Sequence, residues 1–171
     1  MKRATMAAVV ALLTLLPAMA SAGNTKIGVV DLQQVIANSK QGKEATAKLK
    51  KEYEKKKAEV DKKRAEVQRL REELEKKSAL LSEKAKKAKQ DEYREALREL
   101  QHLIDDSKSD LRLKENELRQ QLLKQAVSVV QKLAKEKGYG LVIDMSGGVV
   151  YADPSLNISK EALKRFDKGG K

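Results

Sequence analysis

Apolar residues in the middle of the chain recur every seven positions, which is the spacing of a coiled-coil seam. One series consists of Tyr53, Val60, Val67 and Leu74, and the other consists of Leu97, Ile104, Leu111 and Leu118. Lys56, Lys63 and Ser107 interrupt the companion positions of these stripes. Each predicted helix therefore has one narrow, patchy apolar stripe, and the two stripes are expected to cover each other.

Residues 39–137 favour continuous helix, because they contain no proline and their only glycine, Gly42, lies near the start. Between the stripes, Ser82 and Glu83 form the pattern of a helix N-cap followed by an acidic first turn. We therefore predict an antiparallel helical hairpin with its turn at residues 78–83. Its arms should reach about 60–75 Å at 1.5 Å per residue. One uninterrupted helix is the alternative, since no glycine or proline forces a break there.

Strongly apolar segments flank this helical region and are typical of short strands. Residues 26–31 precede it, and residues 141–144 and 149–152 follow it. The last two segments are predicted to form a tight β-hairpin, because residues 146–148 supply the glycines that such a turn needs.

The ends of the helices also carry local signals. Gly138 follows a basic last turn and predicts the end of the second long helix. Ser159 is expected to cap a final short helix at residues 160–167.

Three short strands cannot bury both of their faces within one chain, and so small a sheet is marginal alone. The same strands from neighbouring subunits would complete a closed sheet and remove the exposed edges. We therefore predict a mainly α protein with a small β component, in which a coiled-coil arm projects from a small β-barrel oligomerisation core. The candidate residues for this core are Ile27, Val29, Val30, Leu141, Val142, Ile143, Val149, Val150 and Tyr151.

The first residues are typical of an export signal. Lys2 and Arg3 precede an apolar run at residues 6–16, and small residues ending at Ala22 form a cleavage site. The run is shorter than the about 20 residues that span a bilayer, although an uncleaved anchor is the alternative. We predict cleavage after Ala22 and a periplasmic location.

The predicted organisation has three parts. These are a signal peptide at residues 1–22, a β-rich oligomerisation core with a short terminal helix from residues 23–38 and 138–171, and a helical-hairpin arm at residues 39–137.

Composition argues against an enzyme with a thick globular core. Charged residues make up 36% of the chain, aromatic residues make up 3%, and there is no cysteine. His102 has no cysteine or second histidine as a co-ligand, so a solvated helix face is expected for it. Asp31, Asp144 and Asp153 sit at predicted strand ends, where turn and cap roles are expected. We predict no catalytic residue, no cofactor and no metal.

Positive charge is concentrated in the first half of the arm. Residues 40–89 carry 19 Lys and Arg against 10 Asp and Glu, whereas residues 90–137 carry 10 of each. The basic residues singled out are Lys55, Lys56 and Lys57 midway along the arm, and Lys84, Lys86, Lys87 and Lys89 at its tip.

This charge has two interpretations. One is a solvated face that keeps the arm soluble, and the other is attraction of acidic unfolded chains, anionic lipid or lipopolysaccharide. Nucleic acid is disfavoured, because the protein is predicted to be exported and lacks aromatic platforms for stacking bases.

Over essentially its whole predicted mature length, the chain resembles the Skp/OmpH family of periplasmic chaperones. The resemblance rests on Ile27-Gly28-Val29-Val30-Asp31-Leu32-Gln33, Gln41-Gly42-Lys43, Leu141-Val142-Ile143-Asp144 and Gly148-Val149-Val150-Tyr151-Ala152-Asp153-Pro154. The order of these motifs around a Lys/Glu-rich region is more specific than any one of them. Asn157-Ile158-Ser159 departs from the Asp-Ile-Thr that the family often has before its last helix.

The resemblance implies a homotrimer with a central β-barrel and three arms that enclose a cavity. It also implies ATP-independent binding of unfolded outer-membrane proteins, which prevents their aggregation. The residues themselves leave two rivals open. One is a coiled-coil spacer of the cell envelope, and the other is a protein that binds lipopolysaccharide or anionic lipid.

Overall fold

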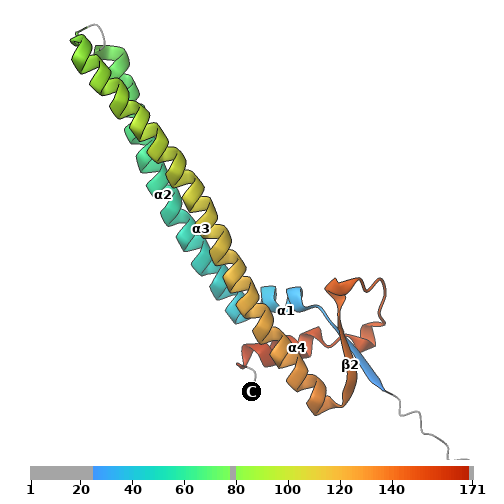
Figure 1. The fold of residues 1–171 in the computed structure, drawn as a ribbon. Coiled ribbons are helices and arrows are strands. Elements are labelled where there is room, and N and C mark those ends of the chain that lie inside the picture. The colour runs from blue at the N-terminus through green and yellow to red at the C-terminus, as the bar shows by residue number, and fades with distance from the viewer. Residues whose placement is uncertain (1–24, 78–79, 170–171) are drawn as a thin grey trace, which may run out of the picture.

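The computed structural model describes residues 25–77 and 80–169. The elements follow in the order β1 (Lys26–Val30), α1 (Leu32–Asn38), α2 (Lys40–Lys77), α3 (Glu83–Lys137), β2 (Tyr139–Asp144) and α4 (Ser159–Asp167). Figure 1 shows α2 and α3 side by side as a long arm, with the other elements gathered at one end. We call that end the base, and it includes residues 126–137 of α3. The chain is mainly helical with a small strand component, as predicted.

The break between the long helices lies where the sequence predicts it. The Ser82 hydroxyl accepts a hydrogen bond from the backbone N–H of Ala85 at 3.4 Å. Gly138 ends α3 in the left-handed conformation, with φ +70°, and its N–H reaches the carbonyls of Ala134 and Lys135. At 1.5 Å per residue, the 38 residues of α2 span about 57 Å and the 55 residues of α3 span about 82 Å. Helix α3 therefore continues beyond the start of α2 into the base.

The apolar seam of the arm is narrow, and its register on α3 differs from the predicted series. Val67, Leu70 and Ala96 are buried together, with Tyr93 and Leu100 packed against them. The prediction placed Leu97 in the seam, but this side chain is 40% exposed. The predicted series was wrong at this position, because Ala96, which is 4% exposed, faces α2 in place of Leu97.

On α2, the predicted apolar series was wrong at its first residue, which is the one nearest the base. Tyr53 is 52% exposed, whereas Val60 and Leu74 are half-buried. Near the base, the aromatic ring therefore lies on the flank of the arm and not between the helices.

The base has a small hydrophobic core within the single chain. Four elements and the residue before α4 contribute Val30, Leu32, Val35, Ala126, Val129, Val130, Leu133, Ile158, Ala162 and Phe166. Phe166 is the largest fully buried side chain. The core anchors one end of α3, so the arm is an extension of this packed unit.

Helix α1 was not predicted, since the only element assigned between residues 23 and 38 was the strand at residues 26–31. Its N-cap is Asp31, whose carboxylate accepts a hydrogen bond from the N–H of Gln34 at 2.8 Å. Leu32, Val35 and Ile36 repeat at three and four residues and face the core of the base. The helix is formed because a local cap and a short amphipathic repeat act together.

The sheet consists of β1 and β2 paired in parallel, and the predicted hairpin after β2 is wrong. Residues Met145–Gly147 form a 3-10 turn, and residues 148–153 are irregular and not a strand. The Asp144 carboxylate accepts hydrogen bonds from the N–H groups of Leu32 and Ser146, which directs the chain away at the end of β2. Val150 is fully exposed and Tyr151 is 82% exposed, so this segment gains no burial from pairing within one chain.

The last helix begins at Ser159, one residue before its predicted start, but Ser159 does not cap it. The Ser159 hydroxyl accepts a hydrogen bond from the N–H of Asp31 at 2.8 Å. Its own N–H donates to the side chain of Asn157 at 2.9 Å, and the cap position, Ile158, makes no side-chain hydrogen bond. The serine therefore ties α4 to the junction of β1 and α1, a long-range contact that a capping rule cannot predict.

Candidate functional site

Residues predicted for the oligomer core divide into a buried and an exposed group. Val29 and Val30 are buried within the chain, and Val142 is half-buried against its core. Val149 is half-buried. The exposed members are Ile27, Leu141, Ile143, Val150 and Tyr151. Sequence reasoning treated all nine alike, because it could not tell which face of each strand the base itself would cover.

One face of the sheet is apolar and exposed at three positions, while Val29, which pairs with Ile143 on the same face, is buried. Ile27 pairs with Leu141 in the parallel register, and Ile143 lies two residues further along β2. Side chains two residues apart on a strand share a face, so these three point the same way. Ile27 is 42%, Leu141 48% and Ile143 39% exposed. Within the described residues, β2 pairs only with β1, so its other edge keeps unpaired backbone groups.

Hydrogen bonds between the helices replace apolar contacts where lysine interrupts the seam. Lys56 bonds to Asp110 at 2.9 Å, and Lys63 bonds to Glu99. Each bond raises the pKa of its lysine, because it favours the charged form. Toward the tip, Lys89 forms an ion pair with Glu73 at 3.5 Å. Toward the base, Lys114 forms an ion pair with Glu52 at 3.6 Å.

Ser107 is the third interruption of the seam. It is 5% exposed, and its hydroxyl oxygen has no hydrogen-bond partner among the described residues. Exposed ion pairs contribute only about 0–1 kcal/mol each and weaken with salt. The two helices are therefore held by a small apolar cluster and screened ion pairs, and the unpaired Ser107 hydroxyl weakens the seam further.

The predicted basic residues have different surroundings. Lys56 is engaged between the helices, while Lys55 and Lys57 are exposed beside it. At the tip, Lys89 bonds to Glu92 at 2.7 Å, which raises its pKa. Lys84, Lys86 and Lys87 instead line an open hollow of about 640 Å³, together with Glu83, Gln90, Asp91 and Arg94. Three of the four lysines predicted at the tip therefore line one hollow, and Arg94, which was not predicted, lines it with them.

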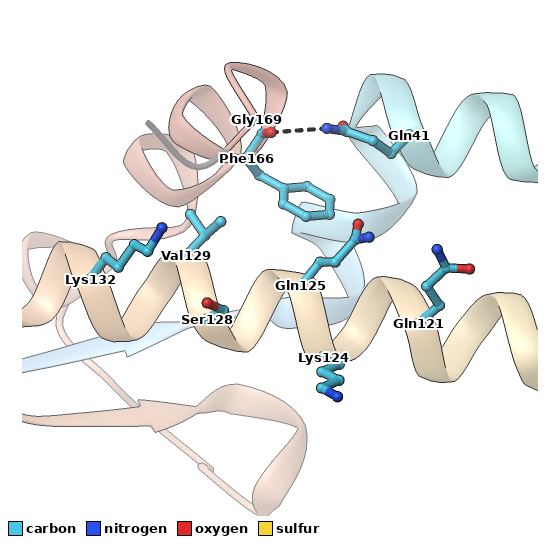
Figure 2. A pocket seen from close by; sticks show the side chains of 9 residues that line it. All are labelled: Gln41, Gln121, Lys124, Gln125, Ser128, Val129, Lys132, Phe166 and Gly169. Carbon is cyan, nitrogen blue, oxygen red and sulfur yellow. Dashed lines mark hydrogen bonds between the residues drawn. The ribbon is translucent and has the colours of Figure 1, made fainter.

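A further hollow, of about 710 Å³, lies where the arm meets the base. Figure 2 shows the Phe166 ring above α3, beside Val129 and Gln125. The side-chain N–H of Gln41 donates to the Phe166 carbonyl at 3.0 Å. Gln121, Ser128 and Lys132 also line the hollow. Amide side chains both donate and accept, so this surface suits peptide-like polar groups. Sequence reasoning missed it because α2, α3 and α4 meet here only in the fold.

The three aspartates at strand ends serve as turn and cap residues, as predicted. Asp31 caps α1 and Asp144 binds the turn after β2. Asp153 accepts hydrogen bonds from the hydroxyl and N–H of Ser155, which lower the pKa of its carboxyl. His102 is exposed.

The described part of the chain contains neither a metal-binding cluster nor a membrane-spanning helix. Within residues 25–77 and 80–169, no group of three His, Cys, Asp or Glu side chains is placed to hold a metal ion. No helix in the same residues has the length and apolar content to cross a membrane. The predicted signal peptide and its cleavage site lie outside the described residues.

The sequence profile of the family described as outer membrane protein (OmpH-like) matches residues 26–166. The chain belongs to this family. An OmpH-like protein from Caulobacter crescentus CB15, assigned as an outer membrane chaperone, has a similar crystal structure, with a TM-score of 0.79. The two sequences are 14% identical, over 84% of this chain and 85% of that chain, so the likeness establishes a shared fold. No curated protein gives a significant match.

Two glycines of the motifs that suggested the OmpH-like family have clear structural roles. A side chain on Gly28 would lie 3.0 Å from the Tyr139 ring, which closes over the sheet. A side chain on Gly42 would lie 1.9 Å from the Ile36 carbonyl oxygen, so glycine permits the tight corner between α1 and α2. These motif residues therefore shape the base and the exit of the arm.

Proposed function

We propose that this protein is a periplasmic holding chaperone that binds unfolded outer-membrane proteins without ATP. The observation that carries the proposal is the arm. Along the described part of the arm, helices of 38 and 55 residues bury between them a small cluster around Leu70 and the side chain of Ser107, so much of their surface is available to a partner. Membership of the OmpH-like family supports a chaperone-type role.

The proposed assembly joins copies of the base through their sheets. Residues 23–38 and 138–171 would form the oligomerisation core, and residues 39–137 would project from it as the arm. The open face of Ile27, Leu141 and Ile143 and the unpaired edge of β2 support this, because neighbouring strands would cover both. Residues 149–152, which have no strand partner within one chain, would then join a closed barrel. The expectation of three copies rests on the family resemblance.

Clients would be captured by charge and held by many weak contacts. The excess of positive charge on residues 40–89 accelerates encounter with acidic chains. Patchy apolar contacts on several arms then add up to useful retention while each contact stays weak. Weak individual contacts allow a client to leave without an energy source.

The proposal is tested with an unfolded outer-membrane porin diluted out of denaturant. Light scattering should remain low when the purified protein is present in near-stoichiometric amounts. The mass of the complex, measured with and without the porin, should show an oligomer that gains one client. Unchanged aggregation would contradict the chaperone and favour the alternative, a coiled-coil envelope spacer.

A second candidate function is binding of lipopolysaccharide or an anionic membrane surface. It is favoured by the hollow at the tip, where Lys84, Lys87 and Arg94 lie together. Lys84→Glu with Lys87→Glu should abolish most binding to lipopolysaccharide vesicles if this is the main function. A chaperone with the same changes should lose mainly capture rate. Lys55→Glu with Lys57→Glu is the matched control, because it alters the same net charge elsewhere on the arm.

A further inference from the structure

The flank of the arm carries an apolar groove near its root. Leu49 and Tyr53 of α2 and Leu111 of α3 line a hollow of about 510 Å³. Leu49 and Leu111 are half-buried, while Tyr53 is 52% exposed. The groove therefore has an apolar floor and an aromatic ring on its wall, which is a common form of binding pocket for an apolar side chain.

The rim of this groove is positively charged and available. Lys50, Lys108 and Arg112 line it, with Glu115 as its one acidic residue. The three cations form no ion pair within the described residues.

The other flank of the arm differs at the same level. There, a hollow of about 470 Å³ is lined by Lys56 and Lys114, and these lysines bond to Asp110 at 2.9 Å and to Glu52 at 3.6 Å. Two of the three lysines on that flank are thus paired within the arm, and Lys55 is the third, whereas all three cations on the flank with the apolar groove are unpaired within the described residues.

The spacing of the groove matches that of an extended chain. Leu49 and Tyr53 are four residues apart, so they lie about 6 Å apart along the helix axis. Side chains on one face of a strand recur every two residues, at about 6.6–6.8 Å. An extended segment lying along the arm can therefore place alternate side chains at Leu49 and Tyr53. Its intervening residues then lie above the apolar floor, where the long side chains of Lys50, Lys108 and Arg112 at the rim can reach them.

The geometry points to this groove, defined by Leu49, Tyr53 and Leu111, as a docking site for an extended polypeptide segment. The segment would carry apolar or aromatic side chains at alternate positions and carboxylates beside them. Membrane β-strands have this alternation, with aromatic girdles at the ends of their apolar band. The inference rests on the proposed function, since it names the part of the arm that holds a client and the pattern that it recognises.

The test uses the full oligomeric protein and a fluorescent, soluble peptide in which aromatic and aspartate residues alternate. Tyr53→Ala should weaken the peptide's Kd about five- to tenfold, as expected for removal of an aromatic anchor. The matched control is Leu113→Ala, because Leu113 is 56% exposed and lines the hollow on the other flank. Its Kd should change less than about twofold. Equal Kd values for Tyr53→Ala and Leu113→Ala would contradict the proposal that the groove is the docking site.

Charge is tested by a second pair of variants. Lys50→Glu with Arg112→Glu should slow peptide association several-fold at low salt, whereas Lys55→Glu with Lys57→Glu should have a smaller effect. A peptide with lysine in place of aspartate should bind weakly to the unaltered protein. If both double variants slowed association equally, the charges at the rim of the groove would have no specific role, and the arm would attract the peptide only through its general positive charge.

A labelling measurement keeps Tyr53 in place and does not depend on the stability of its variant. The chain has no cysteine, so Thr46→Cys and Glu117→Cys each create one labelling position, in the groove and in the other hollow respectively. A photo-crosslinker should capture the peptide from the first position and not from the second. Capture only from the second would overturn the inference.

The porin assay separates this inference from the proposed function. If the unaltered protein binds the peptide in the groove but does not prevent porin aggregation, the chaperone function fails and the docking site stands. If it protects the porin and Tyr53→Ala protects it equally while binding the peptide unchanged, the docking site fails and the chaperone function stands.

Discussion

Replacing Gly42 by alanine should destabilise the corner from which the arm leaves the base. The new methyl group would lie 1.9 Å from the Ile36 carbonyl oxygen, whereas ordinary contacts begin at 3.4 Å, so a shift of about 1.5 Å is needed. That oxygen also accepts hydrogen bonds from the Ser39 hydroxyl at 2.7 Å and from the Ser39 N–H at 3.2 Å. Relief of the clash therefore disturbs the end of α1 as well as the start of α2.

The magnitude follows from three contributions. Overpacking costs about 1–3 kcal/mol, and a weakened hydrogen bond costs about 1 kcal/mol more. Alanine in place of glycine in a helix returns about 1 kcal/mol. The net loss should be about 2 kcal/mol, which lowers Tm by about 4–8 °C in a chain of this size. Thermal and urea unfolding, followed by circular dichroism at one fixed protein concentration, measure both quantities.

Two other glycines serve as controls for Gly42→Ala. Gly147 has no atom within 4 Å of the added methyl group and no positive φ, so Gly147→Ala should stay within about 0.5 kcal/mol. Gly138 has the same free space but φ +70°, so Gly138→Ala should cost about 1–2 kcal/mol from backbone strain alone. If Gly42→Ala were as stable as Gly147→Ala, the steric reasoning about the corner would be refuted.

Three further predictions concern the seam of the arm. Leu70→Ala removes a side chain that is 2% exposed, so it should lower the free energy of unfolding by about 2–4 kcal/mol. Amide hydrogen exchange should then rise in the arm before it rises in the base. Leu80→Ala is the control, because Leu80 is 86% exposed and its removal should change neither quantity. Ser107→Ala should leave stability unchanged or raise it by up to about 1 kcal/mol in urea unfolding, because it removes an unpaired buried hydroxyl; a clear loss would show that this hydroxyl has a partner. The pKa of Lys63 is raised, chiefly by its hydrogen bond to Glu99. The contribution of this bond to folding stability is therefore complete below the ordinary lysine pKa of about 10.4, and it is lost as pH rises through the raised pKa. The stability difference between the native protein and Glu99→Gln should therefore hold across neutral pH and shrink above about pH 10.4, and a constant difference would contradict the assignment.

Features that depend on a few neighbouring residues could be predicted from the sequence. The long helices, the break before Ser82, the end of α3 at Gly138 and the roles of the three strand-end aspartates were all predicted and confirmed. Each depends on contacts within about one helical turn, so the residues that decide it are adjacent in the sequence. Helix α1 had the same kind of local signal, and it was missed because the preceding strand dominated the interpretation.

Other features were decided only when distant segments met. Ala96 and not Leu97 faces α2, because the rotation of α3 is set by packing along the whole arm and in the base. Residues 149–152 form no strand, since β2 pairs with β1 and no residue that the structure describes covers Val150. Lys56 and Lys50 look equivalent in the sequence, yet Asp110 neutralises the first and the second lines an apolar groove. Charge and apolar pattern are properties of the chain, but exposure and pairing depend on partners that only the tertiary fold brings within reach.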